Sequence, residues 1–139
     1  MNNLSLDFSG KTPKLKRKVL KDVIIDRKSK YTVVYNYVEN KQEVDDFIKL
    51  LKSDKYFKEA THNSFAYRIK QENGSLLEGK NDDGEIGAGM CILREIQRAD
   101  FVNIVVVVTR FFGGILLQAD RFKNVINSVK IIFEQDENN

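Results

Sequence analysis

The 139-residue sequence contains a single cysteine, a single histidine and a single proline. Cys91 has no partner for an internal disulfide bond, which is typical of proteins from a reducing compartment such as the cytosol or the nucleus. One histidine and one thiol cannot supply a self-contained zinc site of the usual composition. These shortages leave at most one pair, Cys91 and His62, for nucleophilic catalysis.

Long apolar segments are also missing. The longest apolar run, Ile104 to Val108, is far shorter than the roughly 20 residues that span a bilayer. No apolar stretch follows a short basic start, as it would in a signal peptide. We therefore expect a cytoplasmic protein without a membrane segment.

Length and composition favour one folded domain. Hydrophobic residues make up 42% of the chain and charged residues 31%, as in ordinary globular proteins, and the length suits one hydrophobic core. Residues 1–18 contain the proline and lack periodicity, so we expect a basic flexible tail there. Residues 19–139 are expected to form the single domain.

Positive charge is concentrated at the start of the chain. Residues 1–30 carry nine Lys or Arg and three Asp, a net charge of +6, whereas the whole chain carries +3. Such a segment can contact nucleic acid or an acidic protein surface, although many short basic tails are simply solvated.

The hydrophobic pattern predicts strands and helices that alternate after an initial hairpin. Two β-rich runs within residues 19–38 flank the four-residue connection "DRKS". Further strands are expected near residues 64–69 and 103–109, and helices near 40–51, 87–97 and 120–133. Asn40, followed three residues later by Glu43, is expected to be the N-cap of the first of these helices. The β-branched run at 104–108 does not alternate, which favours a central strand covered on both faces. The order β-β-α-β-α-β-α predicts an α/β (α+β-like) fold with helices on one face of a mixed sheet.

The last predicted helix has a regular apolar pattern. Phe122, Val125, Ile126 and Val129 recur at helical spacing and are expected to be buried, with Asp120 as the N-cap.

Three carboxylates, Asp82, Asp83 and Glu85, lie in a glycine-rich segment before a predicted helix. Neighbouring carboxylates can hold Mg²⁺ or divide the roles of general acid and base. They can equally satisfy the free N–H groups at the helix start, and we favour this structural interpretation. Cys91 is likewise interpreted as a small apolar core residue and not as a nucleophile.

Arg110 ends the predicted central strand and is followed by Gly113, Gly114 and a helix start with Arg121. Ligands of α/β sheets bind at such positions, and helix N-termini favour anions. Alternatively, the glycines permit a tight turn and Arg110 forms an ion pair with a carboxylate of the acidic segment. We favour the ion pair, because glycines beside the carboxylates suit close backbone packing at least as well as ligand approach.

Three blocks in this order and spacing resemble the Impact family, whose bacterial relatives are of the YigZ type: "ATHNSFAYRI", "NDDGEIGAG" and "NIVVVVTRFFGGILLQADRFKNVIN". The resemblance runs from about Lys28 to Phe133, and "GGILLQADRFK" is similar to the eukaryotic branch. It implies an N-terminal-type Impact domain with a fold like domain 2 of ribosomal protein S5. Eukaryotic members usually carry a further N-terminal domain, which the short basic start cannot provide.

The resemblance also implies a function. It points to a non-enzymatic regulator of translation and stress signalling that binds a protein and needs no cofactor or metal. Eukaryotic members compete with a starvation-responsive initiation-factor kinase for its ribosome-bound activator, and they bind actin. An alternative is an RNA- or ribosome-binding domain that acts through the basic start and the Arg110 region.

The polar positions that match the family are expected to form a shared binding surface or a structural network, with no catalytic residue. They are His62, Asn63, Arg68, Asp83, Glu85, Arg110, Gly113, Gly114, Asp120 and Arg121. The sequence departs from the family at Met90-Cys91, where glycine and arginine are frequent, and at Gln118-Ala119, where Gly-Pro is common. The missing arginine weakens the anion-site interpretation.

Overall fold

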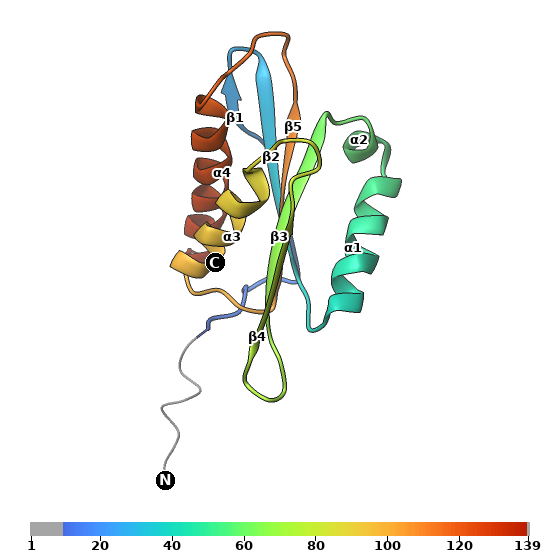
Figure 1. The fold of residues 1–139 in the computed structure, drawn as a ribbon, viewed down its shortest axis with the longest axis vertical. Helices are drawn as coiled ribbons and strands as arrows, with labels where there is room; N and C mark the ends of the chain where they lie inside the picture. Colours follow the sequence, from blue (N-terminus) through green and yellow to red (C-terminus); the bar gives the residue numbers. More distant parts are fainter. Residues whose placement is uncertain (1–9, 139) are drawn as a thin grey trace.

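A computed structural model describes residues 10–138, which form five strands and four helices (Figure 1). In chain order these are β1 (Arg17–Asp26), β2 (Ser29–Tyr37), α1 (Lys41–Ser53), α2 (Lys55–Lys58), β3 (His62–Lys70), β4 (Leu76–Asn81), α3 (Ala88–Arg98), β5 (Ile104–Phe111) and α4 (Asp120–Glu137).

The strands form one sheet in the order β1-β2-β5-β3-β4, and every neighbouring pair is antiparallel. The β-branched run forms β5 at the centre of the sheet, as predicted. Ile104, Val106 and Val108 belong to the core on one face of the sheet. Val105 and Val107 belong to the core on the other.

Helices cover both faces of this sheet. Figure 1 shows α3 and α4 on one side and α1 and α2 on the other. The predicted α/β class is confirmed, but the expectation that helices lie on one face only is wrong. The three inner strands, β2, β5 and β3, carry buried apolar residues on both faces, as Val33 and Val34 of β2 illustrate. Each face of the sheet therefore needs helices to cover it.

The sheet is also not mixed. The sequence interpretation missed β4, which lies between β3 and α3 and has an exposed, glycine-containing edge sequence. Without β4, α3 would be a crossover between parallel strands, because a strand-helix-strand unit restores the strand direction. The additional hairpin strand reverses the chain once more, so β5 runs antiparallel to β3.

The start of the described chain packs on the domain instead of forming a tail. β1 already begins at Arg17, Pro13 is buried, and the backbone N–H of Lys14 donates to Asp136 Oδ1 at 3.0 Å. The expectation of a flexible tail is therefore corrected for residues 10–18. Residues 1–9 lie outside the described part of the chain.

The first hairpin turns more tightly than predicted. Its connection consists of two residues, Arg27 and Lys28, with φ angles of 46° and 71°. Positive φ at both positions is the conformation that matches the twist of two antiparallel strands. Neither residue is a glycine, which is why the sequence favours a longer connection.

The helix starts are only partly as predicted. Asn40 Oδ1 accepts from Glu43 N at 2.9 Å, which confirms the expected N-cap of α1. Asp120 instead occupies the first turn of α4 and pairs with Arg27 at 2.5 Å. On α4, Val125 and Val129 are buried as predicted, whereas Phe122 and Ile126 are only half-buried.

Candidate functional site

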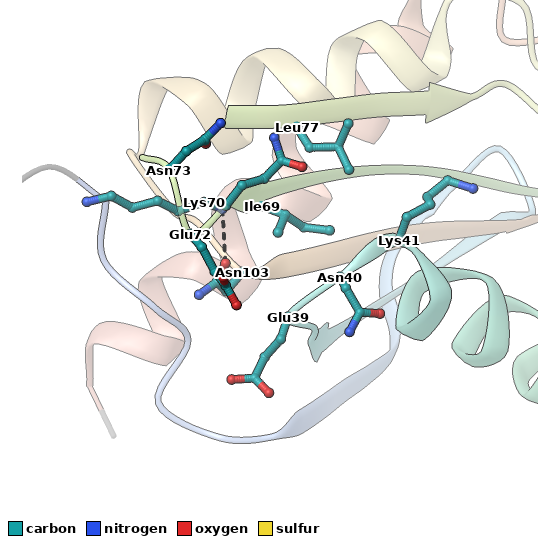
Figure 2. A pocket seen from close by; sticks show the side chains of 10 residues that line it. Glu39, Asn40, Lys41, Ile69, Lys70, Glu72, Asn73, Leu77 and Asn103 are labelled. Carbon is teal, nitrogen blue, oxygen red and sulfur yellow. Dashed lines mark hydrogen bonds between the residues drawn. The ribbon is translucent and has the colours of Figure 1, made fainter. Parts of the chain in front are cut away.

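A hollow of about 800 Å³ lies between the β3–β4 turn and the start of α1 (Figure 2). Its charged lining is mixed in sign, with Glu39 and Glu72 beside Lys41 and Lys70. The backbone N–H of Lys70 donates across it to Asn103 Oδ1 at 3.1 Å. None of the predicted site residues lines this hollow, which lies at the opposite end of the sheet from Arg110.

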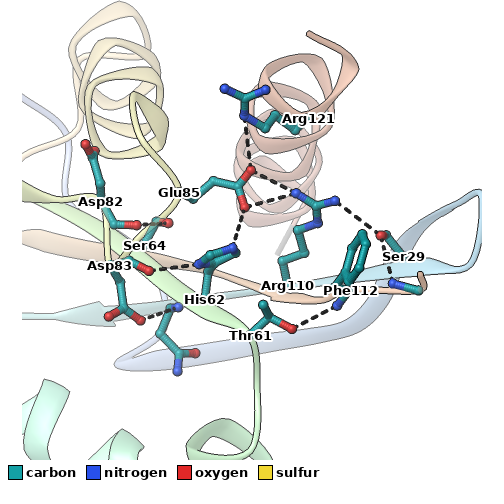
Figure 3. A network of polar contacts seen from close by, with 12 residues as sticks. Ser29, Thr61, His62, Ser64, Asp82, Asp83, Glu85, Arg110, Phe112 and Arg121 are labelled. Carbon is teal, nitrogen blue, oxygen red and sulfur yellow. Dashed lines mark hydrogen bonds and ion pairs between the residues drawn. The ribbon is translucent and has the colours of Figure 1, made fainter. Parts of the chain in front are cut away.

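Sheet register brings the predicted residues together at the other end. Arg110 of β5 lies opposite Tyr31 of β2 on one side and opposite His62 of β3 on the other. Side chains directly opposite one another share a face of an antiparallel sheet. The loop between β4 and α3 then places Glu85 against both His62 and Arg110 (Figure 3).

Arg110 and Glu85 form a buried ion pair. Arg110 Nη1 lies 2.9 Å from Glu85 Oε1 and 3.0 Å from Oε2, and the two residues are only 7% and 5% exposed. Arg110 Nη2 also donates to Ser29 Oγ at 3.4 Å. Two buried charges offset their desolvation only when they are paired and hydrogen-bonded. The predicted ion pair with a carboxylate of the acidic segment is thus present.

Two further basic side chains, His62 and Arg121, lie beside the same carboxylate. His62 Nε2 lies 3.1 Å from Glu85 Oε2, and Arg121 Nε lies 3.4 Å from Glu85 Oε1. The other ring nitrogen of His62, Nδ1, lies 2.9 Å from the carbonyl oxygen of Asp83. Both ring nitrogens therefore face oxygen atoms, which fixes the orientation of the imidazole ring.

The neighbouring carboxylates hold the loop and the start of α3. Asp82 accepts from the backbone N–H groups of Gly87 at 3.0 Å and Gly89 at 2.8 Å. The bond from Gly87, followed by that from Gly89, lowers the pKa of Asp82 although partial burial opposes the shift. Asp83 Oδ2 accepts from Asn63 N at 2.7 Å. These contacts support the structural interpretation of the acidic segment.

The described residues contain no group of three or more His, Cys, Asp or Glu side chains that could hold a metal ion. Cys91 is half-buried and packs against the core between α3, α4 and the sheet. Burial raises the pKa of its thiol. A thiol held in its protonated form is a poor nucleophile, which agrees with a packing role.

Asn63 belongs to the network but faces the opposite side of β3. Its side chain donates to the carbonyl oxygen of Phe57 at 2.8 Å and accepts from Thr109 Oγ1 at 2.8 Å. It therefore ties α2 to the two central strands. These bonds are buried and give Asn63 a structural role at the end of the sheet.

Two predicted site residues lie apart from the network. Arg68 is at the far end of β3, where it pairs with Glu78 at 3.1 Å and Asp100 at 3.0 Å. Asp120 is exposed and pairs with Arg27 of the hairpin turn. The structure thus unites His62, Asn63, Asp83, Glu85, Arg110 and Arg121, and leaves Arg68 and Asp120 outside.

The two glycines after β5 allow a close approach of two loops. A Cβ atom on Gly113 would lie 2.2 Å from the carbonyl carbon of Lys28, so only glycine fits there. Its N–H donates to Ser29 Oγ at 3.2 Å. Gly114 follows with a φ of 93° in the predicted tight turn.

Sequence reasoning missed two hydroxyl residues of this site. Ser29 contacts Arg110 and Gly113, and Thr61 Oγ1 accepts from the backbone N–H of Phe112 at 3.0 Å. The contacts of Ser29 and Thr61 depend on strand register, which the sequence does not show. The serine at the end of "DRKS" was the one sequence feature that indicated a hydroxyl group near the hairpin turn. Its position follows only from a two-residue turn, because that turn makes Ser29 the first residue of β2.

The chain is similar to known proteins in sequence and in structure. The sequence model of the Impact N-terminal domain matches residues 27–132. Protein IMPACT-B of Xenopus tropicalis is 42% identical over 114 residues, which are 81% of this chain and 36% of that protein. The Saccharomyces cerevisiae Protein IMPACT homolog is 34% identical over 110 residues, covering 78% of this chain and 43% of the relative. The chain therefore spans less than half the length of these relatives.

Two solved structures share the fold. A crystal structure of a hypothetical protein superposes with a TM-score of 0.77 at 23% identity, over 89% of this chain and 59% of that one. The structure of the two-domain translational regulator Yih1 gives a TM-score of 0.59 at 31% identity, over 85% of this chain and 46% of Yih1.

Proposed function

Because this chain belongs to the Impact N-terminal domain family, we propose that it is a cytoplasmic regulator of translation that acts by binding a protein and not by catalysis. The observation that carries the proposal is its 31% identity and shared fold with the translational regulator Yih1. As a finer proposal, the chain competes with a starvation-responsive initiation-factor kinase for the kinase's activator.

The polar network supports binding over catalysis. Arg110 and Glu85 are buried and paired with one another, so neither is presented to a substrate. His62 is held between Glu85 and the carbonyl oxygen of Asp83. A general base must instead reach the proton that it removes from a substrate. We therefore assign the network to holding two loops in place.

The two loops carry exposed apolar side chains. The loop before α3 presents Ile86, which is 78% exposed, and the loop before α4 presents Leu116, which is 71% exposed, and Ile115. The loops are joined where Arg121 meets Glu85 and where Gly87 packs against the Phe122 ring. Exposed apolar side chains on rigid loops suit a protein contact. We propose that Ile86 and Leu116 contact the protein partner.

Two other partners are proposed as alternatives. Actin is implied by the family resemblance, and RNA or the ribosome is suggested by the basic start and the Arg110 region. For RNA, the Arg110 region is poorly suited, because a phosphate would have to displace the bound Glu85 carboxylate from a buried guanidinium. Arg17 and Lys21 of β1 are exposed, and they suit RNA binding better than the Arg110 region does.

A starvation assay tests the proposal. Cells that express the chain should show less phosphorylated initiation factor during amino-acid starvation than control cells, and the purified chain should displace the kinase from its activator. The double variant Ile86→Ser/Leu116→Ser should lose both effects while its melting temperature stays within a few degrees.

The matched control is Leu50→Ser/Leu76→Ser, which changes two exposed leucines on α1 and β4. This control should behave as the wild type. If the wild-type chain has no effect on phosphorylation and does not compete for the activator, the competition proposal is wrong. If both double variants fail equally, the loops are not the contact surface.

A further inference from the structure

A second hollow, of about 340 Å³, lies beside the hairpin turn on the face of the sheet that carries α2. It is lined by Asp22, Lys28, Lys30, Tyr56, Phe111 and Phe112. Its volume falls within the range of small-ligand sites. It shares no residue with the Arg110–Glu85 ion pair, although Phe112 lies between the two, 5.6 Å from the Arg110 guanidinium.

Three aromatic rings gather in this hollow. Tyr56 and Phe111 lie 4.9 Å apart at an interplanar angle of 56°, and Tyr56 is fixed by a 2.8 Å hydrogen bond between its hydroxyl group and Thr32 Oγ1. Phe112 is 45% exposed, which is unusual for a phenylalanine at the end of a central strand. Its exposed ring offers a surface on which a planar group can stack.

Ammonium groups surround the rings. Lys28 and Lys30 line the hollow, and Lys21 Nζ lies 4.3 Å from the centroid of the Tyr56 ring. Among residues 10–138, neither Lys28 nor Lys30 forms an ion pair. The carboxylates of Asp26 and Asp120 both pair with Arg27 and not with these lysines. Asp22 is the one acidic residue in the lining, so positive charge is in excess.

We propose that this hollow binds single-stranded nucleic acid, with Lys21, Lys28 and Lys30 at the phosphates and a base stacked on Phe112. Aromatic platforms beside basic side chains are the arrangement by which proteins bind single strands without sequence preference. An acidic peptide would use the ammonium groups but not the rings, and a duplex would keep its bases paired. This site shares no residue with the protein contact proposed at Ile86 and Leu116.

Fluorescence anisotropy with a labelled ten-nucleotide oligo(U) tests the proposal on the purified chain. Binding should weaken with salt, with a slope of log K against log salt of about −2, because each phosphate contact of a single strand contributes about −0.7. The double variant Lys28→Ala/Lys30→Ala should reduce this slope by about 1.4. Lys28→Arg/Lys30→Arg should preserve binding.

The aromatic part of the site is tested separately. Phe112→Ala should weaken oligo(U) binding roughly five- to hundredfold without changing the salt slope, because stacking involves no counterion release. Phe112→Tyr should bind as the wild type does. Asp22→Asn should strengthen binding, because it removes the one carboxylate from the lining.

Lys80→Ala/Lys130→Ala is the matched control, since it removes the same charge from exposed positions on β4 and α4. It should leave the affinity within twofold of the wild type. The proposal is overturned if the control pair weakens binding as much as Lys28→Ala/Lys30→Ala. It is also overturned if the wild type fails to bind oligo(U) at low salt, or if polyphosphate or poly-glutamate competes as well as oligo(U).

Discussion

A single carboxylate, Glu85, is the residue on which the end of the sheet depends. It accepts from Arg110, lies within 3.1 Å of His62 and within 3.4 Å of Arg121, and is 5% exposed. The three partners come from β5, β3 and α4. One side chain thus links two strands and a helix that are far apart in the sequence.

Replacing Arg110 should therefore destabilise the protein strongly. Arg110→Ala leaves Glu85 buried with weaker partners, and we expect the free energy of unfolding to fall by about 3–5 kcal/mol in urea denaturation. The double variant Arg110→Met/Glu85→Met should lose less than Arg110→Ala, because it removes both charges. Phosphate should not raise the melting temperature of the wild type. A rise in the wild type but not in Arg110→Ala would identify a ligand site instead.

Asp82 gives a test of pH dependence. The backbone bonds from Gly87 and Gly89 hold the pKa of its carboxyl below the usual value. The unfolded chain therefore binds the proton more readily, and the stabilisation is present above about pH 4 and is lost as the pH falls. Asp82→Ala should lower the free energy of unfolding by about 0.5–2 kcal/mol at pH 7. The difference between variant and wild type should shrink at pH 3, and a constant difference would argue against this role.

At the level of whole elements, α4 shows which apolar positions carry stability. Ile132 is fully buried against the sheet, whereas Ile126 on the same helix is half-buried. Ile132→Ala should lower the free energy of unfolding by about 2–5 kcal/mol. Ile126→Ala is the matched control and should cost clearly less in the same measurement. Equal losses would mean that the helix is rotated relative to this structure.

The sequence predicted elements with strong local patterns and missed those defined by their neighbours. α1 was identified because its cap and its apolar stripe are local. β4 was missed because it is a short edge strand with only one half-buried face. That omission had a large effect on the predicted topology. With one strand unrecognised, the predicted sheet was mixed, whereas the sheet in the structure is antiparallel.

The candidate site follows the same division. The pairing of Arg110 with a nearby carboxylate could be predicted, because a charge at the end of a buried strand requires a partner. The contacts of Ser29 and Thr61 could not be predicted, because they depend on the register of β2 and on the loop before β3. Arg68 was predicted to belong to the site because it lies in the same sequence block as His62. In the structure it lies at the opposite end of β3 from His62.

Across the whole molecule, the start of the described chain is tied to its end. Asp136 near the end of α4 accepts from Lys14 N and from the Tyr35 hydroxyl at 2.5 Å. Burial, and secondly this bond, raise the pKa of Tyr35 to about 12, so the hydroxyl remains a donor well above neutral pH. These contacts join residues 10–16, β2 and α4.

Removing the Asp136 carboxylate should lower the stability of the fold and reduce the protection of the backbone at Lys14. Asp136→Ala removes the carboxylate that accepts both hydrogen bonds, and we expect the free energy of unfolding to fall by about 1–3 kcal/mol. Amide hydrogen exchange at Lys14 should become faster in the variant. Tyr35→Phe keeps the Lys14 bond and should leave that amide protected. Unchanged exchange in Asp136→Ala would contradict the proposed link.

The strand order has a consequence for how the molecule assembles. The β1–β2 and β3–β4 hairpins each form within a short stretch of chain, but only β5 pairs with both of them. The two hairpins therefore cannot join until the last strand has been synthesised, and folding must wait for contacts between distant residues. Until then β2 and β3 each present an open edge to the surrounding solution. The nascent chain is thus most vulnerable to aggregation just before residues 104–111 emerge.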